Sequence, residues 1–152
     1  MPGIQIDNDF NIHIASEEEY TEAKALRAHV FREVLKLNLS EEHDMDTAYT
    51  CNIVMIHANQ VVGNLRIYDG YESILLGRIV VDPIFGGRGL GKKLVDYAVD
   101  YIKNNGKYKC FNHVNLWSRF ETKVFYEKCG FYNKGETKDF GEISTLWMYR
   151  DL

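Results

Sequence analysis

The segment from Leu75 to Leu94, LLGRIVVDPIFGGRGLGKKL, constrains this chain most strongly. It predicts an apolar strand, an Asp-Pro stop, a glycine-rich turn and an amphipathic helix. A helix that begins in such a turn directs unpaired backbone N–H groups, and the positive end of its dipole, toward an anion. The glycines can take positive φ and bring bare backbone close to that anion, while basic residues add charge; these residues are Gly86, Gly87, Gly89, Gly91, Arg88, Lys92 and Lys93. We therefore expect a phosphate-binding turn.

Three phosphate-binding motifs compete for these residues. A P-loop would begin at Gly86, but Lys93 stands where its Mg²⁺-binding Ser or Thr belongs. A dinucleotide-binding GxGxxG would require glycine where the chain has Lys92 or Leu94. The remaining pattern, a strand, Val-Asp-Pro and then GxG entering a helix, resembles the pyrophosphate loop of the GNAT superfamily of N-acetyltransferases. In that family the ligand is coenzyme A (CoA).

The family loop, Q/R-x-x-G-x-G/A, maps onto residues Gly86, Gly87, Arg88, Gly89, Leu90 and Gly91. Gly86 departs from the usual Gln or Arg, so the resemblance implies a cradle built mainly from backbone, with Lys92 beside it. A second signature, VFYEKCGF from Val124 to Phe131, is similar to the family's "FYEKxGF" helix-to-strand turn. The resemblance covers roughly residues 48–152. A weaker similarity, to a bacterial subgroup, involves the helix around residues 25–32 and the acidic residues that follow it.

The resemblance implies an α/β (α+β) fold with a mixed, mostly antiparallel central sheet, flanked by helices and containing a splayed parallel pair at the CoA site. Residue patterns predict the elements in order. A strand at 4–6 or 12–14 precedes a helix at about 17–37, whose capping box is Ser16 and Glu19. Strands at 51–57, 60–68 and 74–81 then form a meander. After the glycine turn come a helix, a strand at 111–117 parallel to 74–81, a helix at 121–128, and an antiparallel pair at 131–134 and 143–150.

The resemblance also implies where acyl transfer would occur. The pantetheine arm of CoA would lie between the parallel strands beside Ile79, Val80 and Val81, where a backbone N–H can polarise the thioester carbonyl. Tyr126 matches the family tyrosine near the CoA sulfur. Its reference pKa of ~10 exceeds ~8.5 for a thiol, so it stays protonated at neutral pH and can donate to a forming thiolate. Arg119 stands where relatives often have Asn or Gln that contacts the arm.

Other roles stay open at this stage. The general base could be Glu72, Asp82, His113, Glu121 or a water relay. Arg78, a charge within an apolar strand, requires an acidic partner such as Asp44 or Asp46, or else faces the acceptor. Acidic residues after the first helix either form a solvated loop or attract a cationic amine: Glu41, Glu42, Asp44 and Asp46.

Composition predicts one domain over residues 1–152. The net charge of −4 argues against broad nucleic-acid binding, and no apolar run approaches the ~20 residues that a membrane helix needs. The start of the chain has no signal-peptide pattern, so we expect a cytoplasmic protein. Three cysteines at spacings unlike zinc ligands predict reduced thiols and no metal site. The oligomeric state, monomer or homodimer, stays open at this stage.

The sequence thus predicts transfer of an acetyl group from acetyl-CoA to a primary amine of a small molecule or peptide, by direct attack. Three alternatives remain: a non-catalytic acyl-CoA-binding or sensor module, an acyltransferase that uses another acyl-CoA donor, and a P-loop nucleotide binder, which Lys93 disfavours. The acceptor and the preferred acyl chain are not specified.

Overall fold

The computed structural model describes residues 3–6, 9–37 and 49–152. These residues build an eight-stranded sheet of order β1-β2-β3-β4-β5-β6-β8-β7. The strands are β1 (Ile4–Ile6), β2 (Phe10–Ile14), β3 (Thr50–His57), β4 (Gln60–Asp69), β5 (Ile74–Val81), β6 (His113–Arg119), β7 (Tyr132–Phe140) and β8 (Ile143–Asp151). The α-helices are α1 (Glu17–Ala28), α2 (Leu90–Lys103) and α3 (Lys123–Lys128).

The sheet is mostly antiparallel, and β5 with β6 is its parallel pair. This confirms the mixed fold predicted from the sequence. Both N-terminal candidates form strands, because β1 pairs with β2 and β2 in turn pairs with β3. The β3–β4 hairpin turns through Ala58 (φ 49°) and Asn59 (φ 63°). Such left-handed residues match the twist of a tight hairpin.

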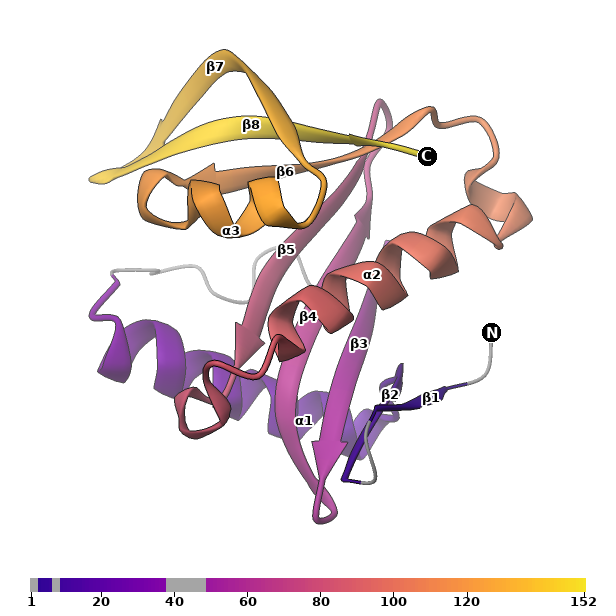
Figure 1. Ribbon diagram of the computed structural model, residues 1–152, viewed down its shortest axis with the longest axis vertical. Coiled ribbons are helices and arrows are strands. Elements are labelled where there is room, and N and C mark those ends of the chain that lie inside the picture. The colour runs from indigo at the N-terminus through magenta and orange to yellow at the C-terminus, as the bar shows by residue number, and fades with distance from the viewer. Residues whose placement is uncertain (1–2, 7–8, 38–48) are drawn as a thin grey trace.

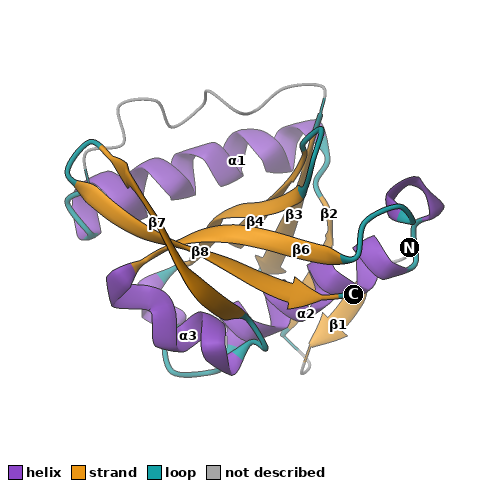
Figure 2. Ribbon diagram, turned by 90° about the horizontal axis from the view of Figure 1, so that it is seen from above, coloured by secondary structure: helices purple, strands orange, loops and turns teal. Residues whose placement is uncertain are grey.

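Helices cover both faces of the sheet. Helix α1 lies on one face, and α2 and α3 lie on the other (Figures 1 and 2). The apolar side of α2 is fully buried against the strands, as shown by Leu94, Val95 and Ala98, which are 0% exposed. A smaller cluster joins Leu26, Val30 and Phe31 on the α1 side to Val80 of β5. Helices α1 and α2 thus pack on opposite faces of the sheet around β5, the strand that leads into the glycine turn.

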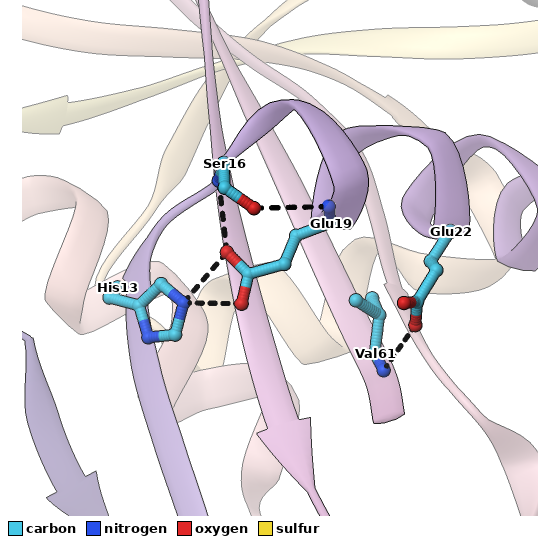
Figure 3. Close-up of polar contacts among 5 residues, drawn as sticks. All are labelled: His13, Ser16, Glu19, Glu22 and Val61. Atoms are coloured by element: carbon cyan, nitrogen blue, oxygen red, sulfur yellow. Dashed lines mark hydrogen bonds and ion pairs between the residues drawn. The ribbon is translucent and has the colours of Figure 1, made fainter. Parts of the chain in front are cut away.

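The capping box predicted for the first helix is confirmed. The Ser16 hydroxyl accepts from the Glu19 backbone N–H (3.2 Å), and the Glu19 carboxylate accepts from the Ser16 backbone N–H (2.9 Å). The same carboxylate meets His13 Nε2 at 2.8 Å (Figure 3). Nearby, Glu22 accepts from the Val61 backbone N–H at 3.2 Å and so ties α1 to β4 (Figure 3).

The predicted end of that helix is wrong. The α-helical part stops at Ala28, and residues His29–Val34 continue as a wider π-helical turn. The turn closes when the Leu35 N–H donates to Val30 O and the Leu37 N–H donates to Phe31 O, with Lys36 at φ 55°. The spacing of apolar residues does not distinguish an α-helix from a π-helix here, because Val30 and Phe31 would be buried in either conformation.

Several other boundaries also differ from the sequence prediction. Strand β6 begins at His113 rather than at 111 and runs on to Arg119, while β7 extends to Phe140 rather than to 134. A 3₁₀ turn, Phe120–Thr122, precedes α3, so the last helix begins later than 121. The extension of β6 matters most because it brings Arg119 into the sheet.

Candidate functional site

Strands β5 and β6 separate after two rungs of pairing. Ile74 lies opposite Val114 and Leu75 opposite Asn115, and within the described residues no further rung joins the two strands. The other edge of β5 stays paired with β4 as far as Val81. Beyond the shared rungs, β6 runs with β8 across the direction of β5 (Figure 1). The second half of β5 therefore has a backbone edge that β6 does not pair.

A bulge in β5 accompanies this separation. Asn64 pairs with Val80 and Arg66 with Gly77, so Arg78 and Ile79 share the place opposite Leu65. Arg78 takes φ 50°, in the left-handed region. Beyond the bulge the Asp82 N–H donates to Val62 O of β4 at 2.8 Å. Because successive N–H groups of a strand point to opposite edges, those of Ile79 and Val81 point away from β4, toward the unpaired edge.

The side chains of the three predicted arm-contacting residues divide between two faces. Ile79 and Val81 are partly buried against the main core, whereas Val80 lies in the α1 cluster and is 5% exposed. Only the backbone of this stretch can line the edge as a continuous surface. Ordinary apolar side chains are therefore compatible with a binding role.

The glycine turn has the conformation that its sequence requires. Gly87 (φ 78°) and Gly89 (φ 72°) lie in the left-handed region, where a Cβ would be strained. A short 3₁₀ turn, Pro83–Phe85, carries the chain from β5 to the glycines, and the Asp82 carboxylate caps it by accepting from the Ile84 N–H at 3.1 Å. Gly89 is the N-cap of α2 and supplies no capping side chain, so the first N–H groups of the helix are left for a ligand.

The other predicted loop residues have distinct contacts. Leu90 is 3% exposed and can offer only its backbone outward, while Gly86 is exposed. Arg88 lies over the Phe10 ring, with 5.4 Å from its guanidinium carbon to the ring centroid. Lys92 pairs with Asp96 at 2.9 Å.

Gly91 has a packing role that the sequence did not reveal. A Cβ at Gly91 would lie 3.0 Å from Phe125 Cζ of α3. Gly91 therefore lets the first turn of α2 pack closely on the helix that carries Tyr126.

A polar cluster also connects α2, β8 and the end of α3. Arg150 donates to Asp96 (3.2 Å) and to the Cys129 carbonyl (2.7 Å), and Asp96 also holds Lys92. The pKa of Asp96 is lowered: burial alone would raise it, but the hydrogen bonds from Lys92 and Arg150 outweigh that effect. This cluster fixes the turn after α3.

Tyr126 is partly buried on α3. Its ring meets the rings of Phe125 and Phe131 edge to face, at centroid distances of 5.0 and 6.1 Å. Gly130, at φ 87°, ends the helix in the left-handed conformation typical of a C-terminal cap. Burial raises the pKa of the Tyr126 phenol well above its ordinary value, while the positive charge of Arg119 acts in the opposite direction. The hydroxyl therefore remains protonated at neutral pH.

The four candidate bases do not gather at one point. Asp82 is a cap, as described above, and Glu72 is exposed. His113 stands at the start of β6, beside the paired rungs, with its ring 5.4 Å from that of Tyr149. Glu121 is 75% exposed and lies 3.6 Å from Arg119.

The sequence prediction missed one buried polar network. Arg27 of α1 is 0% exposed and donates from Nε to Asn64 (2.6 Å) and from Nη2 to Asn52 (2.5 Å). Its signal was its place on the apolar stripe of α1, between Ala23 and Val30. The partners predicted for Arg78, Asp44 and Asp46, lie outside the described residues, as do Glu41 and Glu42 of the acidic cluster.

Within the part of the chain that the structure describes, no group of three or more His, Cys, Asp or Glu residues could hold a metal ion. The described helices are all too short or too polar to cross a membrane. An open hollow lies elsewhere, at the start of α1, lined by Ile14, Ala15, Ser16, Glu17, Tyr20, Thr50, Cys51 and Asn52.

Comparison with known proteins places this geometry in a family. Residues 49–133 match the model of the acetyltransferase (GNAT) domain. A Bacillus subtilis protein assigned to the acetyltransferases is 30% identical over 126 residues, or 81% of this chain and 83% of that protein. The glucosamine 6-phosphate N-acetyltransferase of Arabidopsis thaliana is 50% identical over 56 residues, or 37% of this chain and 35% of that protein. The crystal structure of an acyl-CoA N-acyltransferase from Pseudomonas aeruginosa superposes with a TM-score of 0.78 at 21% identity, covering 93% of this chain and 98% of that one.

The mixed sheet, in which the parallel strands β5 and β6 separate beside the glycine turn, is the architecture that this chain shares with these acetyltransferases. The chain belongs to the GNAT acetyltransferase family.

Proposed function

We propose that this chain transfers an acetyl group from acetyl-CoA to a primary amine by direct attack. One observation carries the proposal: the unpaired edge of β5, with the N–H groups of Ile79 and Val81, leads into the uncapped start of α2 at Gly89. An extended amide-bearing arm fits a strand edge, and a pyrophosphate fits a helix N-terminus.

The cosubstrate site follows from these contacts. The backbone edge along Ile79, Val80 and Val81 would bind the pantetheine arm. The turn from Gly86 through Lys92 would surround the pyrophosphate: the N–H groups from Gly87 onward would donate to it, because that of Gly86 already donates to Pro83 O, and Arg88 and Lys92 would add charge. The name of the Pseudomonas protein, an acyl-CoA N-acyltransferase, supports an acyl-CoA ligand for this fold.

The reaction requires a carbonyl polariser and a proton donor. The N–H of Ile79 or Val81 would bind the carbonyl oxygen of the thioester while the neutral amine attacks its carbon. The C–N bond forms, the C–S bond breaks, and its electron pair stays on sulfur. The Tyr126 hydroxyl then gives its proton to sulfur, while the proton of the amine leaves through solvent.

The acceptor class is a small-molecule or peptide amine. Glucosamine 6-phosphate deserves the first test because the segment shared with the Arabidopsis enzyme is 50% identical. The match spans only about a third of that enzyme, 35% of its length, so its substrate is a candidate and no more.

We propose that residues 1–152 act as one domain, without nucleic acid, membrane or metal, alone or as a homodimer. Three free cysteines fit a reducing compartment, hence the cytoplasm.

Two alternatives differ in turnover or in donor: a silent acyl-CoA sensor, and an enzyme for a longer acyl group. Thermal-shift titration with acetyl-CoA, free CoA and Mg·ATP tests the site, because a ligand that binds only the folded state raises the melting temperature with its concentration. We expect stabilisation by both CoA compounds and none by Mg·ATP. A CoA-release assay with polyamines, arylamines, amino sugars and short peptides then separates an enzyme from a sensor. Stabilisation by Mg·ATP alone would refute the proposal.

A further inference from the structure

The C-terminal strands β6, β8 and β7 present a sheet face on which α1 does not pack. Leu116 of β6 and Met148 of β8 belong to the main core, on the side of α2. Side chains alternate along a strand, so their neighbours Trp117 and Trp147 lie on the opposite side of the sheet. Helix α1 also lies on that side, but it packs on β3, β4 and β5. The two tryptophans therefore belong to a face that lies beyond α1.

Aromatic rings form the floor of this face. Trp117 lies opposite Trp147 in the pairing of β6 with β8, and the ring centroids are 4.5 Å apart. Phe140 of β7 meets Trp117 edge to face at 6.0 Å and is 44% exposed. We call Trp117, Trp147, Phe140 and the neighbouring Lys138 the tryptophan patch. The patch contains both tryptophans of the chain.

The ammonium group of Lys138 lies over these rings. Its Nζ atom is 4.8 Å from the centroid of Phe140 and 5.8 Å from that of Trp117. Within residues 3–6, 9–37 and 49–152, no carboxylate forms an ion pair with it. A cation that is held against apolar rings without a counter-ion in the described chain favours an anion beside it.

The register of the strands adds a second cationic residue to the same region. Thr145 of β8 lies opposite both Lys138 of β7 and Arg119 of β6. Arg119 pairs loosely with Glu121, at 3.6 Å, and the Glu121 side chain is 75% exposed. On β7, Glu136 accepts from a tyrosine hydroxyl of β8. A ligand that carries a carboxylate therefore complements the charge of the patch.

Trp117 also stands on the stretch of β6 that borders the opening. Among the described residues, Asn115 is the last residue of β6 that pairs with β5, and Trp117 follows two positions later. Helix α2, to whose N-terminus we assign the pyrophosphate, lies on the other face of the sheet (Figure 1). An amine held on the patch would therefore approach the opening from the side that the pyrophosphate site leaves free.

We infer that the tryptophan patch binds the acceptor, and that this acceptor is an aromatic amine with a carboxylate, as in an aromatic amino acid. The inference rests on the proposed function, whose acceptor class it narrows. The ring of the ligand would pack on Trp117 and Phe140 while its carboxylate pairs with Lys138, which leaves the primary amine to attack the thioester. A sugar fits less well, because the Thr145 hydroxyl already donates to the Lys138 carbonyl at 2.7 Å.

Tryptophan emission tests the inference directly, because both tryptophans belong to the patch. L-Phenylalanine, which does not emit in the tryptophan band, is titrated into protein saturated with free CoA. Phenethylamine lacks the carboxylate, and cyclohexylalanine lacks the aromatic ring. We expect L-phenylalanine to change the emission saturably and to bind roughly tenfold more tightly than phenethylamine, the effect of about one charge-assisted hydrogen bond. It should also bind several-fold more tightly than cyclohexylalanine.

One substitution and a matched control isolate Lys138. Lys138→Met keeps the apolar stem and removes the charge, so it should abolish the preference for L-phenylalanine over phenethylamine. Lys134 lies on the same strand and also rests on a ring, with Nζ 4.5 Å from the centroid of Tyr149. Lys134→Met should keep the preference. A general structural defect would weaken both amines alike, and a thermal shift with acetyl-CoA confirms that each variant is folded.

The outcomes also separate the two proposals. If the wild type binds acetyl-CoA but shows no preference for L-phenylalanine, or if Lys138→Met keeps that preference, the inference is overturned while the proposed function stands. If acetyl-CoA does not stabilise the wild type, the proposed function fails, and the acceptor role of the patch fails with it.

Discussion

The Tyr126 hydroxyl is the side-chain group to which we assign proton transfer to sulfur. Tyr126→Phe keeps the ring packed against Phe125 and Phe131, so affinity for acetyl-CoA should change little. Turnover should fall by ~10²–10⁴-fold, the usual range for general acid catalysis. Steady-state kinetics with an active acceptor, together with calorimetry, measures both quantities. Tyr71→Phe is the control because that side chain is 100% exposed. Wild-type turnover in Tyr126→Phe would remove the acid role.

Gly89 offers a second test at a single residue. A Cβ there would meet no protein atom within 4 Å, but it would stand at a strained φ of 72° on the turn to which we assign the pyrophosphate. We expect Gly89→Ala to bind CoA roughly tenfold more weakly, about the loss of one charge-assisted hydrogen bond.

Gly135→Ala is a matched control for the backbone strain. Gly135 also has positive φ, 85°, and open surroundings, but it lies in β7. Both variants should lose a similar amount of stability, whereas only Gly89→Ala should lose affinity in a calorimetric titration. Equal affinities for CoA would show that the pyrophosphate binds elsewhere.

At the scale of elements, Asp96 joins α2 to β8 and, through Arg150, to the turn after α3. Its folded-state pKa is held below the unfolded value of 3.8. A depressed carboxyl pKa adds stability that is present above the unfolded pKa and disappears as pH falls through the folded pKa. We therefore expect Asp96→Asn to melt at a lower temperature than the wild type at pH 7, and the difference to shrink below about pH 4.

The matched control for Asp96 lies on the same helix. Asp100 is exposed, and its backbone carbonyl accepts from the Asn104 side chain. Asp100→Asn should therefore leave the melting temperature nearly unchanged at every pH. A pH-independent deficit in Asp96→Asn would mean that its carboxylate acts through packing rather than through charge.

At the scale of the whole molecule, some features of the fold are specified by short stretches of sequence. The Ser16 capping box and the left-handed Gly87 and Gly89 were predictable because short-range backbone geometry demands those residue types. The chain order of strands followed from alternation and from turn residues. The resemblance to GNAT proteins supplied the parallel pair, and the fold confirms it.

Other features depend on contacts between distant segments and leave little local signal. The bulge at Arg78 follows from the register of β4 against β5, and the contact between Gly91 and Phe125 follows from the packing of α2 on α3. The end of α1 at Ala28 was missed because a π-helical turn keeps the same residues buried.

Amide hydrogen exchange with and without acetyl-CoA tests most directly whether the opening between β5 and β6 is the cosubstrate site. We predict that acetyl-CoA slows exchange at Ile79, Val81 and the first turn of α2, and that Mg·ATP does not. Protection confined to the hollow around Ser16, Tyr20 and Cys51, with the β5 edge unchanged in protein saturated with acetyl-CoA, would contradict the proposed site.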